Sequence, residues 1–135
     1  MIGLIATLLL SQIPALANVK LDPVRLEAEL AADVDVIASL EKNRDDASIA
    51  RPVDVRFVGQ KSNLEKLASA LSKGGWMIIQ MIPAGDGLYA LDTSHKQTTE
   101  GGPLRELTET SLRIESVFNV RYDGWGTVAK TGKEK

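Results

Sequence analysis

Apolar residues recur along the chain with two different periods, and these periods predict its helices and strands. From Asp22 to Arg44 they return every three or four positions, the spacing of an amphipathic helix with Asp22 as its N-cap and Pro23 as its first residue. From Pro52 to Val58 they alternate with polar residues, as in a half-buried strand. We therefore expect a helix and then a strand in the first half of the chain.

Two further helices and a last strand are expected from local signals. Ser62 and Glu65 have the spacing of a capping box before an apolar helical stripe, and Gly74-Gly75 ends that helix. Pro103 opens the other helix, which carries leucines at helical spacing. Asn119 to Tyr122 is expected to form a short strand after it.

A β-hairpin is expected between these two helices. Trp76 to Ile82 is apolar at all but one position, which favours a central strand covered on both faces. Pro83 ends this strand, and Gly85-Asp86-Gly87 supplies residues that accept positive φ in a turn. Leu88 to Ser94 then forms the second strand of the hairpin.

The order of these elements predicts the fold class. Without the first helix, the order is strand, helix, strand, strand, helix, strand. This is the order of the α+β ferredoxin-like split βαβ sandwich, in which an antiparallel four-stranded sheet carries two helices on one face. The first helix is an extra N-terminal element.

Residues 1–17 are predicted to be a signal peptide that is cleaved after Ala17. They carry no charged side chain, and Ala15-Leu16-Ala17 has the small-x-small pattern that signal peptidase accepts. The apolar run from Ile2 to Leu10 is shorter than the ~20 residues of a membrane-spanning helix. The expected location is therefore periplasmic or secreted, with no permanent membrane span. Because the usual basic residue at the start is missing, a cytoplasmic location is the alternative.

Charge and cysteine content exclude several classes of function. The 135 residues include 16 basic and 18 acidic ones, so the chain lacks the basic surplus that nucleic-acid binding requires. The absence of cysteine removes disulfides, thiol nucleophiles and cysteine zinc sites. Phe57 and Trp76 are expected in the core rather than as base-stacking residues. The length predicts one domain over residues 18–127, followed by a flexible basic tail over residues 128–135.

The sequence offers little for catalysis or metal binding. His95 is the single histidine, expected at the surface, and no familiar hydrolase, metalloprotease or nucleotide-loop motif is present. An enzyme interpretation, a small hydrolase or transferase, would rely on Asp86, Asp92 and His95 near the hairpin. The acidic residues of the first helix and of the following turn are interpreted as solvated surfaces: Glu27, Glu29, Asp33, Asp35, Asp45 and Asp46. No catalytic residue, metal or cofactor is therefore expected, and a protein-binding domain is the class that remains.

One peptide near the C-terminus concentrates aromatic residues and glycines. The strand is expected to end at Tyr122, Asp123-Gly124 to form a tight turn, and Gly126 to let the chain leave close to the indole of Trp125. In one interpretation Trp125 covers an end of the sheet while Asp123 accepts backbone hydrogen bonds. In the other, the two aromatic side chains form an anchor for a partner. Tyr122, Asp123, Gly124, Trp125 and Gly126 are therefore the candidate binding residues.

Residues 118–127, from Phe118 to Thr127, closely resemble the C-terminal signature of the regulator of ribonuclease activity B family, small proteins that bind and inhibit the endoribonuclease RNase E. The resemblance covers about residues 33–127. It includes the Asp45-Asp46 turn after the first helix and the Arg51 to Val55 entry into the first strand. It implies a domain that acts by binding a protein and not by catalysis.

The chain departs from the family pattern in three ways. Arg44 stands where the family usually has a glycine before the two aspartates, and the tail is basic where the best-known members have an acidic one. RNase E works in the cytoplasm, which an exported domain would not reach. The expected function is therefore an exported, non-enzymatic regulatory domain that binds an envelope protein. The alternative is a cytoplasmic inhibitor or modulator of RNase E, and the sequence leaves the oligomeric state open.

Overall fold

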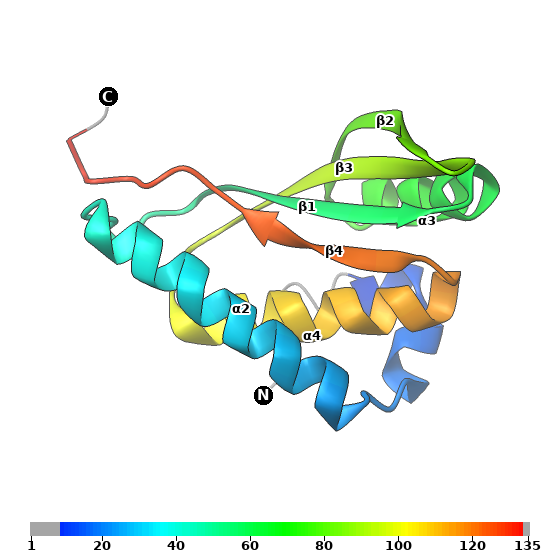
Figure 1. Ribbon diagram of the computed structural model, residues 1–135, viewed down its shortest axis with the longest axis horizontal. Coiled ribbons are helices and arrows are strands. Elements are labelled where there is room, and N and C mark those ends of the chain that lie inside the picture. The colour runs from blue at the N-terminus through cyan, green and yellow to red at the C-terminus, as the bar shows by residue number, and fades with distance from the viewer. Residues whose placement is uncertain (1–8, 134–135) are drawn as a thin grey trace.

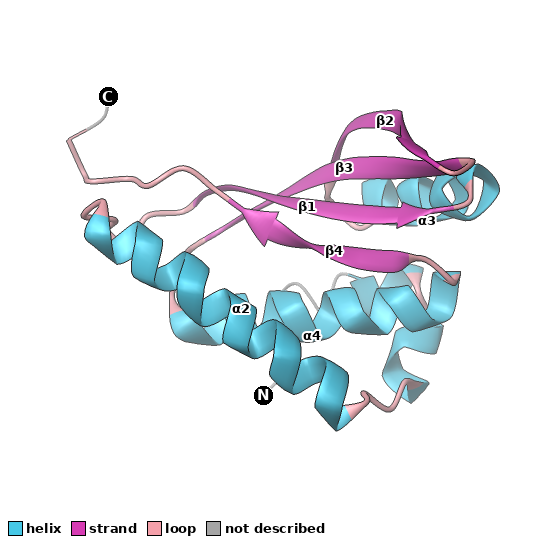
Figure 2. Ribbon diagram, in the orientation of Figure 1, coloured by secondary structure: helices cyan, strands magenta, loops and turns pink. Residues whose placement is uncertain are grey.

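Four strands form one antiparallel sheet, with helices packed against one of its faces (Figure 1). This computed structural model describes residues 9–133. Its elements are a 3₁₀ helix η1 (Pro14–Asn18), α2 (Pro23–Lys42), β1 (Arg51–Gly59), α3 (Lys61–Lys73), β2 (Met77–Gly85), β3 (Leu88–Gln97), α4 (Gly101–Phe118) and β4 (Arg121–Gly126). α3 lies behind β2 and β3, and α4 lies below the sheet (Figure 2).

The sheet order is β2-β3-β1-β4, and every neighbouring pair is antiparallel. This is the expected ferredoxin-like arrangement, with α2 as the extra helix. β1 is central, and its alternation places Val53, Val55 and Phe57 in the core against the helices. The intervening side chains, Asp54 and Arg56 among them, face the other side, which we call the open face.

β2 is an edge strand, so its expected position in the centre of the sheet is wrong. An unbroken apolar run is equally compatible with a strand covered on one face. Met77 and Ile79 are 67% and 50% exposed, respectively. The strand also continues past Pro83 to Gly85, because a proline without an N–H group is tolerated on an edge. The hairpin turn is as expected, with positive φ at Gly85, Asp86 and Gly87.

Helix ends follow the sequence signals in part. Asp22 caps α2 as expected, because its carboxylate accepts the Val24 N–H at 3.0 Å. The predicted capping box is wrong: α3 begins at Lys61, so Ser62 already lies in the helix and no side chain caps it. α4 begins two residues before Pro103, at Gly101, since proline fits throughout the first turn of a helix.

The N-terminal segment contributes to the core. Leu9, Ile13 and Leu16 are 0%, 5% and 2% exposed, and they belong to the same apolar cluster as the leucines of α3 and α4. A Cβ atom added at Gly74 would lie 2.5 Å from Leu9 Cδ2, so glycine permits this contact. Residues 1–8, the first half of the predicted signal peptide, lie outside the described residues. In the described range, no helix is long and apolar enough to cross a membrane.

Candidate functional site

The C-terminal peptide contains a β-bulge in place of the predicted turn. Val55 pairs with Trp125 and Phe57 pairs with Tyr122, so the single residue between them on β1 faces two residues on β4, Asp123 and Gly124. Gly124 has φ +100°, a conformation that favours glycine. The strand therefore does not end at Tyr122 but continues to Gly126. Tyr122 and Trp125 are three positions apart and would face opposite sides of a regular strand. Because of the extra residue, both side chains face the helices.

Trp125 is held under α2 by a buried carboxylate. Its indole N–H donates to Asp33 Oδ1 at 2.8 Å, and the Thr108 hydroxyl of α4 donates to Asp33 Oδ2 at 2.6 Å. Burial raises the pKa of Asp33, against the opposing effect of these two hydrogen bonds. Asp33 is only 6% exposed, so its expected place on a solvated helix face is wrong. The sequence pattern of α2 could not predict the burial of Asp33, because the indole donor that binds it comes from β4.

Tyr122 is fixed through its backbone. Its N–H donates to Glu115 Oε2 at 2.8 Å, and Arg25 donates to its carbonyl at 3.2 Å and to Glu115 at 2.9 Å. Arg25 also pairs with Glu29 on the same helix. The side chain is 2% exposed, and burial raises the pKa of its hydroxyl. Hydrogen bonds at both aromatic residues thus connect β4 to α2 and α4.

The exposed part of the candidate binding peptide is the bulge itself. Trp125 is 9% exposed, and neither aromatic ring presents its face to solvent. Asp123 accepts a hydrogen bond from the Arg121 guanidinium at 3.1 Å, which is a side-chain partner and not the backbone partner expected. Gly126 lies opposite Asp54 at the end of the strand. Which of these residues contact a partner stays a prediction.

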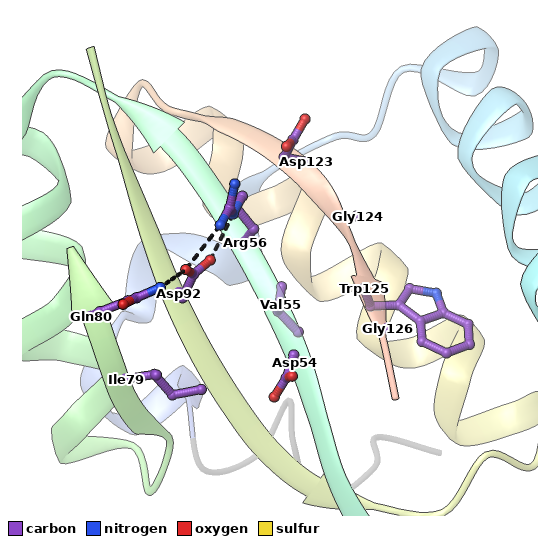
Figure 3. Close-up of a pocket in the computed structure, with 10 residues that line it drawn as sticks. All are labelled: Asp54, Val55, Arg56, Ile79, Gln80, Asp92, Asp123, Gly124, Trp125 and Gly126. Atoms are coloured by element: carbon purple, nitrogen blue, oxygen red, sulfur yellow. Dashed lines mark hydrogen bonds and ion pairs between the residues drawn. The ribbon is translucent and has the colours of Figure 1, made fainter. Parts of the chain in front are cut away.

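A shallow hollow of about 440 Å³ lies on the open face beside the bulge (Figure 3). We call it the open-face hollow, and it is lined by Asp54, Val55, Arg56, Ile79, Gln80, Asp92, Asp123, Gly124, Trp125 and Gly126. All four strands contribute to it. Four of the five candidate binding residues border it, although the Trp125 side chain points away toward the helices (Figure 3).

A fixed polar array forms the centre of this hollow. Arg56 of β1 donates two hydrogen bonds to Asp92 of β3, at 2.7 and 3.0 Å, and Gln80 of β2 donates to the same carboxylate at 2.8 Å (Figure 3). Hydrogen bonding to Arg56 lowers the pKa of Asp92, against a smaller effect of burial. Arg56 and Gln80 were not among the site residues predicted from the sequence. The alternation on β1 indicated which side chains share a face, but the pairing register that joins them comes only from the structure.

A second hollow, of about 480 Å³, lies on the other side of the bulge. Its lining residues come from α2, α4 and β4: Arg25, Glu29, Ala32, Glu115, Arg121, Tyr122, Asp123 and Gly124. Asp123 and Gly124 border both hollows. The bulge is therefore a ridge between two hollows, and its backbone position is set by Gly124.

A buried ion pair connects the Asp45-Asp46 turn to the start of β1. Arg51 and Asp45 approach to 2.7 Å, with side chains 1% and 3% exposed. Asp45 also accepts the Thr99 hydroxyl and the Lys130 N–H, at 2.6 and 2.8 Å. Burial raises the pKa of Asp45, but these hydrogen bonds and Arg51 together lower it below its ordinary value. Asp45 is therefore not the solvated side chain expected, because partners distant in the sequence enclose it.

The structure separates the residues of the enzyme interpretation. Asp92 lies on the open face, whereas His95, three residues later, pairs with Val53 on the helix face. His95 is half-buried against Trp76, with ring centroids 5.2 Å apart, and burial lowers its pKa. His95 is therefore only partly at the surface where it was expected. Asp86 lies in the hairpin turn. Over residues 9–133, no group of three or more His, Asp or Glu residues could hold a metal ion.

Comparison with known proteins agrees with the resemblance noted in the sequence. The family model described as Regulator of ribonuclease activity B matches residues 30–127. The matched region starts within α2 and includes all four strands, α3 and α4, so both hollows lie largely within it. No curated protein matches the chain.

Proposed function

The chain belongs to the regulator of ribonuclease activity B family, and on this premise we propose that it acts without catalysis, by binding a protein and changing that protein's activity. The family match over residues 30–127 is the observation that carries the proposal. The separation of Asp92 from His95 on opposite faces of the sheet supports it, since those residues cannot act on one substrate together.

The partner in this proposal is an endoribonuclease of the RNase E type, whose cleavage of RNA the protein slows. The family description names ribonuclease activity as what is regulated. Binding to the enzyme, and not to its RNA, is consistent with a net charge of -2, because phosphate contacts need an excess of Lys and Arg.

The proposed contact surface is the open-face hollow with the bulge at its border. A partner needs a surface that is held in place before binding, since ordering flexible side chains weakens affinity. The Arg56, Asp92 and Gln80 array meets this condition, because three strands hold it through hydrogen bonds of 2.7–3.0 Å. Asp54 adds an exposed carboxylate on the same face.

A ribonuclease partner requires the protein to stay where RNA is processed. The Ala15-Leu16-Ala17 pattern favours export, whereas burial of Leu9 and Leu16 in the core favours retention of the segment with the domain. We take retention as the proposal and export, with an envelope partner, as its alternative. Mass spectrometry of the N-terminus of the native protein distinguishes them, because a species that begins at Asn18 would support export.

A charge reversal in the hollow tests the proposal. Asp54→Arg should weaken binding to an RNase E-type enzyme by about tenfold or more, because it replaces an exposed carboxylate of the proposed surface with a cation. Asp35→Arg is the matched control, since Asp35 is also exposed but lies on α2 and lines neither hollow. Binding is measured by calorimetry, and inhibition by the cleavage rate of an RNA oligonucleotide.

Three outcomes are informative. Loss of binding and inhibition in Asp54→Arg alone, with unchanged melting temperatures in both variants, supports the proposed surface. Equal inhibition by both variants and the wild type would place the contact elsewhere. If the wild type neither binds nor slows the enzyme, the ribonuclease partner is wrong.

A further inference from the structure

We propose that the chain forms a twofold dimer by antiparallel pairing of the β2 edges of two copies. The inference goes beyond the proposed function and does not depend on it. It rests on three properties of this edge: its exposed apolar side chains, its lack of charge and the contrast with the other edge of the sheet.

Exposed apolar side chains are concentrated on the β2–β3 hairpin. Six large apolar side chains in the described range are exposed, and three of them, Met77, Ile79 and Leu88, belong to this hairpin. Met77 and Ile79 lie on β2 itself, which has a strand neighbour on one side only, β3. Proteins usually protect such an edge with charged residues, because its unpaired N–H and C=O groups attract another strand.

The charge pattern favours a second copy as the partner. β2, from Met77 to Gly85, contains no charged residue, so antiparallel self-pairing places no like charges opposite each other. A different partner strand that carries Lys, Arg, Asp or Glu would find no charged side chain on β2 with which to form an ion pair. The opposite edge, β4, carries Arg121 and Asp123, and the N–H and carbonyl groups of its Tyr122 are already bonded to Glu115 and Arg25. The β2 edge is therefore better suited to self-pairing than the β4 edge.

Twofold symmetry then fixes the geometry of the dimer. Two identical edges that pair antiparallel are related by an axis perpendicular to the sheet, so both open faces lie on the same side of an eight-stranded sheet. Pro83 has no N–H group, which limits the pairing to Met77–Ile82. The pairing of β2 with β3 shifts register between Ile78 and Gln80. Ile79, the residue between them, lies near the middle of this segment and also lines the open-face hollow. Dimerisation would therefore bring the two hollows next to the shared edge.

Analytical ultracentrifugation of the full chain over a range of concentrations tests the dimer. The wild type should show a reversible monomer–dimer equilibrium. Ile79→Lys places two ammonium groups near each other across the axis and should raise the dimer dissociation constant by about tenfold or more. Val34→Lys is the matched control, because Val34 is 62% exposed on α2, the helix that packs against β4. It should leave the equilibrium unchanged.

Met77→Lys provides a second variant if Ile79→Lys does not fold, as judged by circular dichroism. A wild type that stays monomeric at the highest concentration overturns the proposal. A dimer that both edge variants leave unchanged also overturns it, because the interface would then lie elsewhere. Hydrogen exchange supplies a direct readout: the outward-facing amides of β2 should become protected as the protein concentration rises.

Discussion

Arg44 occupies a backbone conformation that glycine adopts at lower cost. It follows the last turn of α2 with φ +61°, while its N–H donates to Glu41 O at 2.9 Å and the Asp45 N–H donates to Leu40 O at 3.0 Å. These two bonds define a Schellman motif, whose left-handed residue is usually glycine. The family's glycine before the two aspartates thus has a structural reason, and this chain bears the strain of its replacement.

Arg44→Gly should therefore increase the free energy of unfolding by about 1 kcal/mol, since a left-handed non-glycine residue costs about that much. Urea denaturation measures the change. Lys42→Gly is the control, because Lys42 is the last residue of α2 and glycine there should reduce stability by up to about 1 kcal/mol. A loss of stability in both variants would show that the Arg44 side chain contributes more than its backbone costs.

Asp33 should make stability depend on pH in the direction opposite to most carboxylates. Burial raises its pKa above the ordinary value of 3.8, so the folded state binds this proton more readily than the unfolded state. Its contribution to stability is therefore largest below the ordinary value and is lost as the pH rises through the raised pKa. Asp45 and Asp92, whose pKa values are lowered, act in the opposite direction.

Comparison with Asp33→Asn isolates this effect, because the other carboxylates are common to both proteins and cancel. The free energy of unfolding of the wild type minus that of Asp33→Asn should increase as the pH falls from neutral toward 3.8. Chemical denaturation at several pH values gives the difference. Asp35→Asn, at an exposed position on the same helix, is the matched control for the substitution itself. A flat difference for Asp33→Asn would mean that Asp33 titrates as it does in the unfolded chain.

At the scale of elements, the sequence predicted the order of strands and helices but not the contacts between them. The period-two pattern of β1 and the turn at Asp86-Gly87 are local, and both were correct. The position of β2 at an edge depends on which strand pairs with it, and a run of apolar residues contains no such information. Fold class was therefore accessible from the sequence, whereas the place of β2 was not.

The site shows the same division. The sequence indicated residues 122–126 as special and proposed a turn at Asp123-Gly124, but a bulge is defined by the opposite strand, here by the pairing of β1 with β4. It also placed Asp33 in solvent, because the partner donors come from Thr108 and Trp125, far along the chain. Long-range side-chain contacts, and not local propensities, account for what was missed.

At the scale of the whole molecule, the N-terminal segment determines where the folded domain begins. The family match starts at residue 30, yet Leu9, Ile13 and Leu16 fill part of the same core as α3 and α4. If the segment is retained, its burial contributes directly to global stability. If it is cleaved after Ala17, the mature domain must be stable without it.

Leu16→Ala distinguishes these cases in protein purified from its native cells. Retention predicts a loss of about 2 to 5 kcal/mol in the free energy of unfolding, because truncating a fully buried leucine loses apolar burial and leaves a cavity. Gln12→Ala is the control, since Gln12 lies in the same segment with an exposed side chain and should cost little. Thermal and urea unfolding measure both variants. Identical stability of Leu16→Ala and the wild type would mean that residue 16 is absent from the mature protein or lies outside its core. Export, with an envelope partner, would then be the favoured proposal.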